Sequence, residues 1–356
     1  MPPVRILYLV TELDPGGAER QLAALATGLD RKAFDPAVAS LAPPGEMAKP
    51  LREAGIPVFS VAARGVSDLK ALGRLKRLLQ ELEPDLLHTF LFHANVAGRV
   101  CARLAGLSAP VVASVRVEDP RALHRWGEKA TARWADAFVA NSETTAAFLD
   151  GALGLPASKI HCIPNAALPL PAFEPGAFRK SLGIPAATPL VVAVGRLDRQ
   201  KGFDLLIRAL PEGCALALVG EGPEKAALKR LAGTKGVHFA GRLPSAAGAL
   251  ADADLAALPS RWEGMPNVAL EALQLGKAVV GASVGGLTEL LDGGAGVLVP
   301  SDDVPALRQA LSTLLADPSR RADLGKAAKI RAARYDPSRM IQAHQSLYRN
   351  LLETSA

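Results

Sequence analysis

Residues 191–210 read VVAVGRLDRQKGFDLLIRAL, and this stretch contains an apolar run, a turn and a helical pattern in that order. The apolar run ends at Gly195, and a pattern with helical spacing begins after Gly202. Such a sequence is typical of a βα unit, in which a buried parallel strand is followed by a helix that covers one face of the sheet. The stretch therefore predicts an α/β fold.

The same alternation continues on both sides of this stretch. Helical patterns such as those at 68–82 and 93–106 separate the apolar runs of the first half. We therefore expect two doubly wound, Rossmann-like parallel-sheet domains that face a cleft, with ligands beyond the carboxyl ends of the strands. The runs that predict strands are VRILYLV, DPAVASL, PDLLH, PVVASV, AFVAN and KIHCIP in the first half, and PLVVAVG, CALALVG, VHFAG, DLAALPS, AVVGAS and AGVLVP in the second.

A change of texture marks the boundary between the two predicted domains. The stretch PNAALPLPAFEPGAF, within 164–190, is rich in proline and has no period, which is typical of an inter-domain linker. Only helical patterns follow residue 303. We predict an N-terminal domain at 1–168, a C-terminal domain at 169–335 and a last amphipathic helix at 336–356.

The composition fits a folded protein with anionic ligands. Hydrophobic residues make up 49% of the 356 residues and charged residues 21%, with a mean hydropathy of +0.18. The formal net charge of +6 suits anionic small molecules or an anionic membrane surface. No aromatic-basic RNA motif is present, so we expect no nucleic acid partner.

The cysteines and the apolar runs indicate a cytoplasmic protein. Cys101, Cys162 and Cys214 are isolated and odd in number, as expected of free thiols in a reducing compartment. The run VRILYLV is too short for a signal peptide and carries Arg5. No run of about 18 apolar residues predicts a transmembrane helix. We expect a cytoplasmic location and consider peripheral attachment at the inner face of the membrane.

The turn in the opening stretch predicts an anion site. Arg196 follows the strand end, and Lys201 lies at the helix start, where free backbone N–H groups already favour anions. Arg196 offers a planar fork of donors and Lys201 a point charge. Solvated loop charges are the structural alternative. The stretch LVGEGPEK at 218–225 has the same order of a strand, a glycine turn at Gly220 and a helix. A tight turn with ordinary capping explains this stretch equally well.

A second stretch, SRWEGMPNVALEALQLGK at 260–277, keeps two carboxylates in a segment that otherwise has the pattern of buried packing. Its proline suits the first turn of a helix. Asn267, Glu271 and Gln274 then share one helical face. A carboxylate on that face can accept hydrogen bonds from paired hydroxyls, as on a ribose, whereas a solvated face is the structural alternative. Free amide groups at the helix start, near Met265, Asn267 and Val268, would point at an anion.

Together these two stretches carry a family resemblance. GRLDRQKG, followed by SRWEGMPNVALEAL with Glu263 and Glu271 separated by seven residues, closely resembles the retaining nucleotide-sugar glycosyltransferases of the GT-B fold, family four. GGAER near the start and VGEGPE in mid-domain fit the same order along the whole chain. The resemblance implies transfer of a sugar, with retention, from a UDP- or GDP-sugar such as GDP-mannose to a glycan, lipid-linked or small-molecule acceptor in cell-envelope or exopolysaccharide biosynthesis. It also implies that the last helix packs back on the N-terminal domain.

The resemblance assigns roles to residues of the second domain. Arg196 and Lys201 would bind the donor diphosphate and stabilise it as it leaves, Glu271 would hold the ribose hydroxyls, and Glu263 would contact the donor sugar near its reacting carbon. The stretch VPSDD near residue 300 would be a weaker neighbour of the nucleotide. The catalytic set is then Glu263, Arg196 and Lys201, and the donor-binding set is Gly195, Gly220, Glu221, Gly264, Met265, Pro266, Asn267, Val268 and Glu271.

The chemistry predicts an enzyme that needs no metal. A departing nucleoside diphosphate gains negative charge, and fixed cations and helix N-termini can stabilise it. We therefore expect no metal and no cofactor, with the nucleotide sugar as co-substrate. The Asp252–Asp254 pair could be misread as a metal motif, but capping and solubility are the expected roles because it opens a strand. For retention we expect a same-face displacement in which the leaving phosphate helps deprotonate the acceptor, and a carboxylate nucleophile is the alternative.

The first domain is expected to bind the acceptor. In TELDPGGAERQLAAL at 11–25, small residues before a helix let the backbone approach a ligand, although a plain βα turn would look the same. His88 at a strand end and His93 at a helix start make a ligand role plausible. The predicted acceptor-side residues are Gly16, Gly17, Glu19, Arg20, His88, His93, Arg116 and Asn165.

Two positions depart from the family pattern. Relatives often carry a histidine where this chain has Arg116, which can bind a phosphate or a carbonyl but cannot shuttle a proton. Glu118 and Asp119 are the alternative polar groups there. In IPNAALPL at 163–170, Asn165 remains but the acid that usually follows in relatives is absent.

Basic helices in the first domain predict a weak contact with anionic lipid. The four cations of DPRALHRWGEKATARWAD at 119–136 are spaced four apart and lie near two tryptophans. Solvated faces are the structural alternative. The stripe consists of Arg121, Arg125, Lys129 and Arg133 with Trp126 and Trp134, and Lys70, Arg74, Lys76 and Arg77 add to it.

Two other functions stay open on the sequence. A sugar-nucleotide epimerase of GT-B-like fold would share the two-domain pattern, and so would a non-catalytic module that binds a sugar nucleotide. Acceptor-dependent release of a nucleoside diphosphate would distinguish transfer from both.

Overall fold

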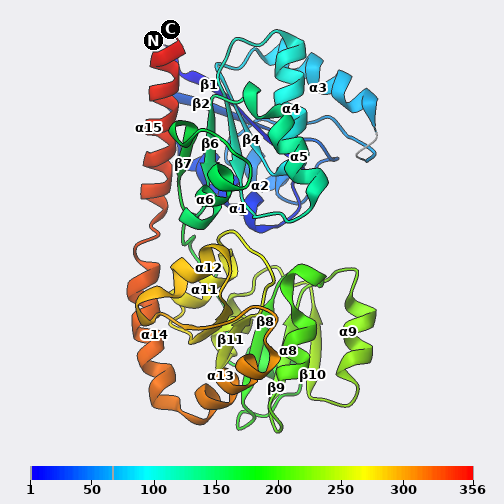
Figure 1. The fold of residues 1–356 in the computed structure, drawn as a ribbon, viewed down its shortest axis with the longest axis vertical. Helices are drawn as coiled ribbons and strands as arrows, with labels where there is room; N and C mark the ends of the chain where they lie inside the picture. Colours follow the sequence, from blue (N-terminus) through cyan, green and yellow to red (C-terminus); the bar gives the residue numbers. More distant parts are fainter. Residues whose placement is uncertain (1, 66–67, 356) are drawn as a thin grey trace. The chain divides into compact units, whose positions relative to one another are not determined.

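The computed structural model describes residues 2–65 and 68–355 and divides into two compact units. Unit 1 comprises Met1–Ala166 and Pro337–Ala356, and unit 2 comprises Ala167–Asp336. The boundaries predicted after residues 168 and 335 lie close to these. Each unit is a parallel sheet covered by helices (Figure 1), as the alternating apolar runs predict.

Unit 1 contains a seven-stranded sheet in the order β3-β2-β1-β4-β5-β6-β7, and all of its neighbouring strands are parallel. The direction of winding reverses between β1 and β4, and a reversal of this kind opens a crevice for ligands at the carboxyl ends of the strands. The strands are β1 (Val4–Val10), β2 (Phe34–Ser40), β3 (Val58–Ser60), β4 (Leu86–Phe90), β5 (Val111–Val115), β6 (Ala137–Ala140) and β7 (Ile160–Cys162).

The helices of unit 1 follow the strands as the sequence predicts. The described α-helices are α1 (Gly17–Gly28), α2 (Ala48–Glu53), α3 (Leu69–Leu82), α4 (Phe92–Ala105), α5 (Ala122–Thr131), α6 (Glu143–Gly151) and α15 (Pro337–Ser355), and short 3-10 turns are η1 (Ala132–Trp134) and η2 (Ala157–Lys159).

Unit 2 contains a six-stranded parallel sheet in the order β10-β9-β8-β11-β12-β13. Its strands are β8 (Leu190–Val194), β9 (Ala215–Val219), β10 (Val237–Gly241), β11 (Leu255–Leu258), β12 (Val279–Ala282) and β13 (Val297–Val299). Its helices are α7 (Ala177–Ser181), α8 (Phe203–Ala209), α9 (Lys225–Ala232), α10 (Ala247–Asp252), α11 (Asn267–Gln274), α12 (Gly285–Leu291), α13 (Val304–Ala316) and α14 (Pro318–Ala332), with 3-10 turns η3 (Arg199–Lys201) and η4 (Asp292–Gly294).

The strands of unit 2 are apolar on both faces because helices cover both. Leu190 and Val192 of β8 belong to one buried cluster, whereas Val191 and Ala193 belong to another. The two clusters lie on opposite faces of the sheet, since successive side chains of a strand point to opposite sides. This explains why the predicted strands are continuous apolar runs rather than alternating ones.

Each apolar run that was predicted to be a strand contains a strand in the structure. One further strand, β3, lies outside the predicted runs. β3 is three residues long, lies at the sheet edge and is half-buried. It pairs with β2 through backbone bonds, such as the bond that Val61 N donates to Ser40 O at 3.0 Å at its end. A strand this short has too few side chains to show a period.

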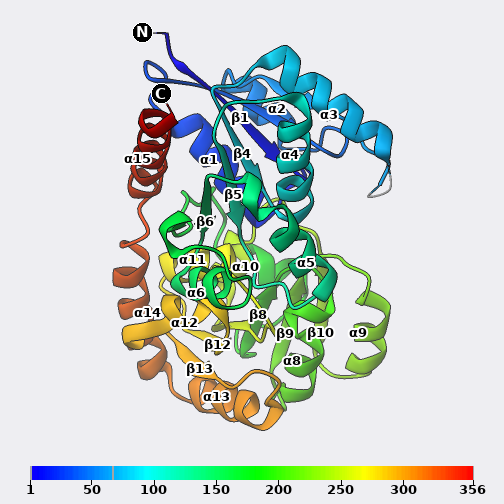
Figure 2. The ribbon, with the colours of Figure 1, turned by 45° about the horizontal axis from the view of Figure 1, so that its top comes forward.

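The C-terminal helix belongs to unit 1, which confirms that it packs back on the N-terminal domain. α15 runs beside α1 (Figure 2). Tyr348 of α15 is fully buried, and its hydroxyl lies 3.3 Å from the Tyr8 hydroxyl and 2.7 Å from His88 Nδ1. The helix therefore completes the core of unit 1 by burying polar tips that pair with one another.

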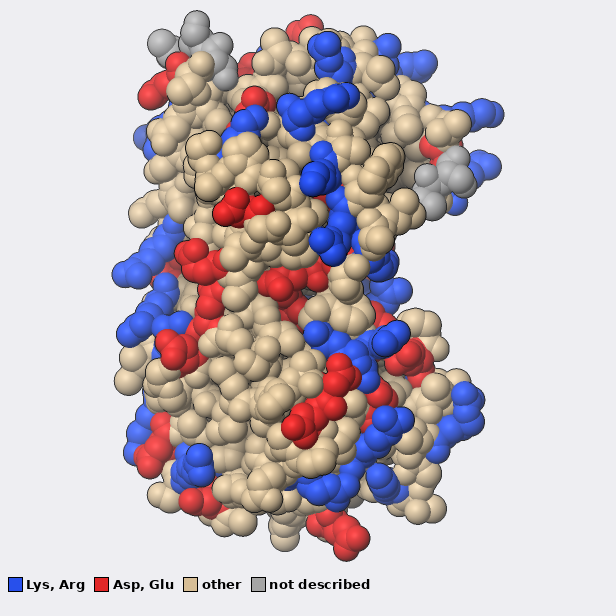
Figure 3. Space-filling model, viewed as in Figure 1, with Lys and Arg blue, Asp and Glu red and all other residues tan. Residues whose placement is uncertain are grey.

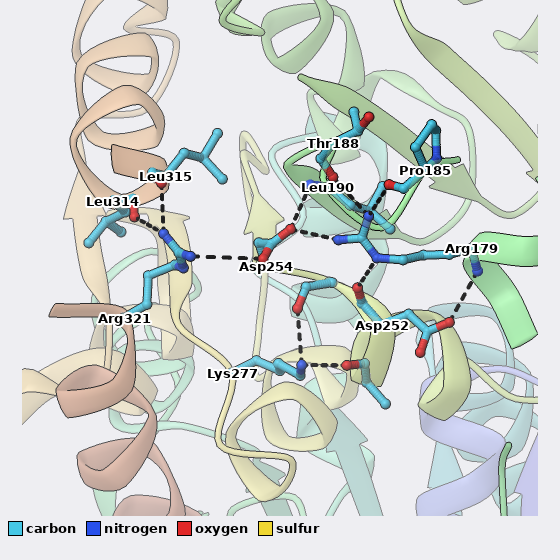
Figure 4. Close-up of polar contacts among 12 residues, drawn as sticks. Arg179, Pro185, Thr188, Leu190, Asp252, Asp254, Lys277, Leu314, Leu315 and Arg321 are labelled. Atoms are coloured by element: carbon cyan, nitrogen blue, oxygen red, sulfur yellow. Dashed lines mark hydrogen bonds and ion pairs between the residues drawn. The ribbon is translucent and has the colours of Figure 1, made fainter. Parts of the chain in front are cut away.

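The carboxylates of Asp252 and Asp254 accept hydrogen bonds from other groups of the protein (Figure 4). The Asp252 carboxylate accepts hydrogen bonds from the N–H groups of Gly176 at 2.6 Å and Arg179 at 3.1 Å, so it caps the start of α7. Asp254 accepts from the Arg179 guanidinium at 2.6 Å and from Leu190 N at 2.8 Å. The capping role expected from the sequence is confirmed.

Candidate active site

The anion site predicted in unit 2 lies at the carboxyl ends of β8, β9 and β11. Gly195 N donates to Val219 O at 3.0 Å, and Gly220 N donates to Gly241 O at 2.8 Å, so the turns after β8, β9 and β10 lie against one another. Among the donor residues proposed there, Glu221 is paired with Lys225 at 2.6 Å on the surface. The turn after β8 leads into η3 and presents the two predicted cations.

Lys201 and Glu263 form a direct ion pair. Lys201 Nζ donates to Glu263 Oε1, and the Ser260 hydroxyl donates to the same oxygen at 2.8 Å. Only 4% of Glu263 is exposed. A buried carboxylate needs a partner of this kind, because an unpaired charge in the interior is costly. Since an ammonium has three donors, this pairing leaves Lys201 with capacity to bind an anion.

The Glu263 side chain contacts Lys201 and Ser260 in the structure. The contact with a donor sugar that the family resemblance implies for its carboxylate stays a prediction. The pair joins two of the three predicted catalytic residues, one from η3 and one from the loop after β11. In this arrangement Glu263 orients the Lys201 ammonium, as a second-layer carboxylate does.

Arg196, in contrast to the buried Glu263, lies on the surface. Its side chain is 72% exposed, and the nearest acid is Asp198, with 3.7 Å between Arg196 Nε and Asp198 Oδ2. An exposed pair at this distance is weak. Arg196 can therefore turn toward an anion at the strand ends without breaking a structural contact.

Arg261 anchors the loop that carries Glu263, and the sequence analysis did not single it out. Its guanidinium donates to both carboxylate oxygens of Asp204 at 2.9 Å, to Arg199 O at 2.8 Å and to Asp302 at 2.8 Å. Burial opposes the ionisation of Asp204, but the hydrogen bonds from Arg261 together with the charges of Arg261 and Arg208 outweigh it and lower the Asp204 pKa. This fork joins the loop after β11 to the turn that holds Lys201.

Asp302 belongs to the stretch VPSDD that the sequence placed near the nucleotide, and it contacts the same loop. A second link is made by Gln200, which donates from Nε2 to Trp262 O at 2.9 Å and accepts at its carbonyl from Arg261 N at 2.7 Å. No period or motif in the sequence signals these partners, because each is an isolated polar residue in a loop.

A glycine pair after β12 also shapes the site. Gly286 N donates to Gly264 O at 2.8 Å. A Cβ on Gly285, whose φ is +48°, would lie 2.1 Å from the carbonyl oxygen of Glu263. Only glycine allows this approach. The doublet in SVGGLTE follows a predicted strand, as Gly16 and Gly17 do, and this similarity could have revealed it.

Helix α11 starts one residue later than its proline suggests. Pro266 is the N-cap, with φ −74° and ψ 124°, and Asn267 is the first helical residue. Asn267, Glu271 and Gln274 are partly exposed, whereas Ala269, Leu270, Ala272 and Leu273 are buried, so the predicted common face is confirmed. Gln274 Nε2 donates to Ala167 O at 3.2 Å, which leaves the start of the helix as the end for a ligand. Met265 is buried beneath that start, and Val268 is partly buried.

In unit 1, Gly16 is the N-cap of α1, and Gly17 is its first residue. The Glu19 carboxylate folds back over this N-terminus, since its Oε2 lies 2.2 Å from the place of a Cβ on Gly16. Burial raises the pKa of Glu19 to about 7, against a smaller lowering by the charge of Arg116. Arg20, the next residue, is partly exposed, and its N–H donates to Gly16 O at 3.2 Å.

Arg116 and Asn165, which the sequence analysis placed in the same predicted site, contact each other in the structure. Arg116 is buried, and its guanidinium donates to Asn165 Oδ1 and lies 5.6 Å from the centre of the Phe90 ring. Burial lowers the pKa of Arg116 to about 10, and the nearby Glu19 carboxylate opposes this. Arg116 therefore stays cationic at neutral pH and cannot transfer a proton there.

The expectation that His88 faces a ligand is corrected by its burial. His88 has no exposed surface, and its nitrogens are occupied by the Tyr348 hydroxyl at 2.7 Å and the Ser114 hydroxyl at 2.9 Å. Burial holds the pKa of His88 well below its usual range. Its side chain leaves the middle of β4 rather than its end and so belongs to the core. His93 at the start of α4 is half-buried.

Comparison with known proteins identifies the family. The chain belongs to the group 1 glycosyltransferases of family four: residues 15–167 match the family described as Glycosyltransferase Family 4, and residues 188–317 match Glycosyl transferases group 1. The resemblance found in the sequence is thus confirmed, and the protein is a glycosyltransferase.

Several curated relatives are similar over much of the chain. The D-inositol 3-phosphate glycosyltransferase of Nocardiopsis dassonvillei is 34% identical over 304 residues, which cover 74% of this chain and 70% of the relative. The enzyme of the same name from Xylanimonas cellulosilytica is 32% identical over 285 residues, or 70% of this chain and 68% of the relative. A GDP-mannose-dependent monoacylated alpha-(1-6)-phosphatidylinositol monomannoside mannosyltransferase of Corynebacterium glutamicum is 36% identical, but the match spans only 44% of this chain and 45% of that enzyme.

Solved structures confirm the GT-B fold. HepE of Anabaena, crystallised with UDP and glucose, superposes with a TM-score of 0.83 at 24% identity, covering 98% of this chain and 100% of that one. Sucrose-phosphate synthase of Thermosynechococcus elongatus superposes with a TM-score of 0.84 at 22% identity and the same coverage. Among the described helices, none is long and apolar enough to cross a membrane.

Proposed function

We propose that this glycosyltransferase takes its sugar from a nucleoside diphosphate sugar bound by unit 2 and transfers it with retention of configuration. The observation that carries the proposal is the Lys201–Glu263 pair, a cation held by a buried carboxylate at the carboxyl ends of β8 and β11. Ligands of doubly wound sheets bind at such ends. A diphosphate is the ligand that a fixed ammonium, a mobile guanidinium and helix amides suit together.

These groups supply the chemistry that a leaving diphosphate needs. When the bond between the sugar C1 and the phosphate oxygen breaks, the nucleoside diphosphate keeps the electron pair and gains negative charge. Lys201 and Arg196 stabilise that charge, as do the amides at the start of α11. In the same-face displacement that we propose, the leaving phosphate accepts the proton of the attacking hydroxyl. Lys201 and Arg196 would then stabilise the charge of the leaving diphosphate, as a divalent ion does in other transferases.

Glu271 lies on the partly exposed face of α11 with Asn267. We propose that its carboxylate accepts hydrogen bonds from the two ribose hydroxyls of the donor, since a carboxylate is a two-pronged acceptor. We propose that Glu263 holds Lys201 toward the phosphates through Oε1, which also accepts from Ser260, and contacts the donor sugar through Oε2. The proposed donor is a UDP-sugar or a GDP-sugar, and the proposal makes no choice between the two bases.

Unit 1 is proposed to bind the acceptor, a glycan, lipid-linked sugar or cyclic polyol. Its support is the cluster of Gly16, Gly17, Glu19 and Arg116 at the carboxyl ends of β1 and β5. The named relatives act on D-inositol 3-phosphate and on a phosphatidylinositol mannoside, so these two compounds are the first acceptors to test. Both would suit a role in cell-envelope biosynthesis.

A substrate screen tests the proposal. The protein is incubated in EDTA with UDP-glucose or GDP-mannose, each with and without the two acceptors, and the released nucleoside diphosphate and the product are measured. We expect acceptor-dependent release and a product of retained configuration, reduced by about tenfold or more in Glu271→Gln. Isomerisation of the sugar without an acceptor would instead identify an epimerase, and saturable binding with no turnover a binding module.

We also propose that unit 1 docks weakly on anionic lipid through α5. Leu123 and Trp126 are 73% and 70% exposed on this helix, and Arg125 and Lys129 are exposed beside them. Figure 3 shows basic side chains over this side of unit 1. Arg121 and Arg74 contribute less than their spacing suggests, because Arg121 is bound to Asp119 and Arg74 to Val61 O.

Flotation with anionic liposomes tests the docking. We expect binding at low salt that weakens by about half or more at high salt, because surface attraction is screened. Trp126→Ser should weaken it, and Ile330→Ser, at an apolar residue of unit 2 that is equally exposed, should not. Binding that does not depend on salt or on Trp126 would contradict the proposal.

A further inference from the structure

A histidine and an aspartate that the proposed mechanism does not use lie together at the start of α5. His124 Nδ1 is 2.8 Å from Asp119 Oδ2. Asp119 belongs to the segment after β5, and the ring of His93, at the start of α4 after β4, lies 5.6 Å from the His124 ring. The cluster is thus built at the carboxyl ends of two central strands, next to the place where the sheet reverses.

The contact with Asp119 determines which nitrogen of His124 carries the proton. Burial raises the Asp119 pKa, but hydrogen bonds from Arg121 and from His124 outweigh it and lower the pKa. An ionised carboxylate only accepts, so Nδ1 carries the hydrogen in the neutral ring and Nε2 presents a lone pair. Within residues 2–65 and 68–355, no group hydrogen-bonds to that Nε2, and the side chain is 13% exposed.

The ring is held in place from behind. Phe92 stacks on His124, with 3.8 Å between ring centres and 9° between planes. A Cβ on Gly127 would lie 3.1 Å from Phe92 Cε2 and Cζ, so the absence of a side chain there makes room for the phenyl ring. Just before Phe92, Leu91 has φ +72° and ψ 156°, a region that leucine rarely adopts. Backbone strain of this kind persists where a site depends on the geometry.

We propose that His124 Nε2 accepts a hydrogen bond from a hydroxyl of the acceptor, a sugar or cyclic polyol, and that Asp119 and Phe92 position the ring for it. This rests on the proposed function and deepens it, because it names a specificity-determining residue in unit 1. His124 takes no proton from the reacting hydroxyl. It selects acceptors that carry a hydroxyl at the right place, and a site built to bond a hydroxyl rejects analogues that lack it.

Acceptor binding by calorimetry tests the inference on the whole chain with UDP or GDP present. The probes are D-inositol 3-phosphate, free inositol and methyl mannoside. For the probe that binds best, we expect His124→Phe to weaken affinity by about tenfold or more, because this variant keeps the stack on Phe92 but loses the acceptor nitrogen. His124→Gln should weaken affinity less, because its amide oxygen can still accept a hydrogen bond. His161→Phe, at another half-buried histidine of unit 1 on β7, is the matched control and should stay within about twofold.

The outcomes separate this inference from the proposed function. Wild-type affinity in His124→Phe, or no binding of any probe by the wild-type protein, overturns the inference. Donor binding is followed in parallel by thermal shift, and failure of the wild-type protein to bind either nucleotide sugar would overturn the proposed function instead. If His124→Phe does not fold, His124→Leu, which also removes both ring nitrogens, takes its place in the same titration.

Discussion

Strands β8 and β11 of unit 2 carry charged side chains at both of their ends. At the amino ends, Asp254 binds Arg179 at 2.6 Å, Leu190 N at 2.8 Å and Arg321 at 3.8 Å (Figure 4). At the carboxyl ends, Lys201 binds Glu263, and Arg196 is 72% exposed.

The difference shows how a structural cluster can be told from a site for a ligand. At the amino ends each charge meets several groups of the protein: Lys277 donates to the carbonyls of Ala251 and Ala253, and Arg321 donates to those of Leu314 and Leu315. At the carboxyl ends Lys201 is paired with the single carboxylate of Glu263, and the Arg196 side chain is 72% exposed and 3.7 Å from Asp198. A saturated cluster stabilises the fold, whereas a cluster with remaining positive charge can bind an anion.

The largest expected effect tests the carboxyl-end cluster. Lys201→Ala should lower kcat/KM by about 10²–10³-fold, because it removes a fixed charge from the leaving diphosphate. Initial rates with a nucleotide sugar measure it. Lys201→Gln separates activity from folding, since it can still bond the buried Glu263. Lys326→Ala, at an exposed pair with Asp323, is the control; equal rates in all three variants would refute the donor site.

The second prediction concerns Glu19, the buried acid of unit 1. Its pKa is raised from 4.5 to about 7, so the folded state holds its proton more tightly than the unfolded state. The stabilisation is full below pH 4.5 and is lost as pH rises through about 7. Urea unfolding of the wild-type protein relative to Glu19→Gln should show a loss of up to about 3 kcal/mol over that range. Parallel pH profiles for the two proteins would show that Glu19 is not so perturbed.

The third prediction tests the amino-end cluster. Asp254→Asn should lower the free energy of unfolding by about 1.5–3 kcal/mol, because it removes charge-assisted hydrogen bonds to Arg179 and Leu190. Urea titration measures the change. Donor affinity should stay the same, since this edge of the sheet is not the ligand edge. A variant of normal stability and weakened donor binding would reverse our assignment of the two clusters.

The smallest expected effect concerns Arg196. Arg196→Ala should weaken donor binding by about tenfold and leave the melting temperature unchanged, since its one ion pair among residues 2–65 and 68–355 is the exposed pair with Asp198 at 3.7 Å. The remaining affinity should depend less on salt than in the wild-type protein. Titration of the donor at two ionic strengths measures both. Full donor affinity would leave Lys201 as the sole cation of the site.

Much of the fold could be predicted from local pattern. The apolar runs located every strand except β3, whose three residues cannot show a period. The C-terminal helix was predicted from its spacing, and its placement in unit 1 from the family resemblance. The turn residues of the proposed donor site could be predicted because a strand, a glycine and a cation follow one another in the chain.

The errors and omissions share one cause. His88 looked like a strand-end ligand, but its side chain points into the core between Tyr348 and Ser114. Arg261 was not singled out in the sequence, but it binds Asp204 of α8 through two hydrogen bonds. In both cases the partner lies far along the chain, where no local pattern can indicate it.

By itself the sequence determined the α/β class, the strand ends and the family, because period and turn chemistry are local properties of a chain. Only the tertiary structure decided that Lys201 binds Glu263, 62 residues away, and that Arg116 binds Asn165, 49 residues away. Such pairs form because the order of strands in a sheet, and not the order of residues, brings their ends together.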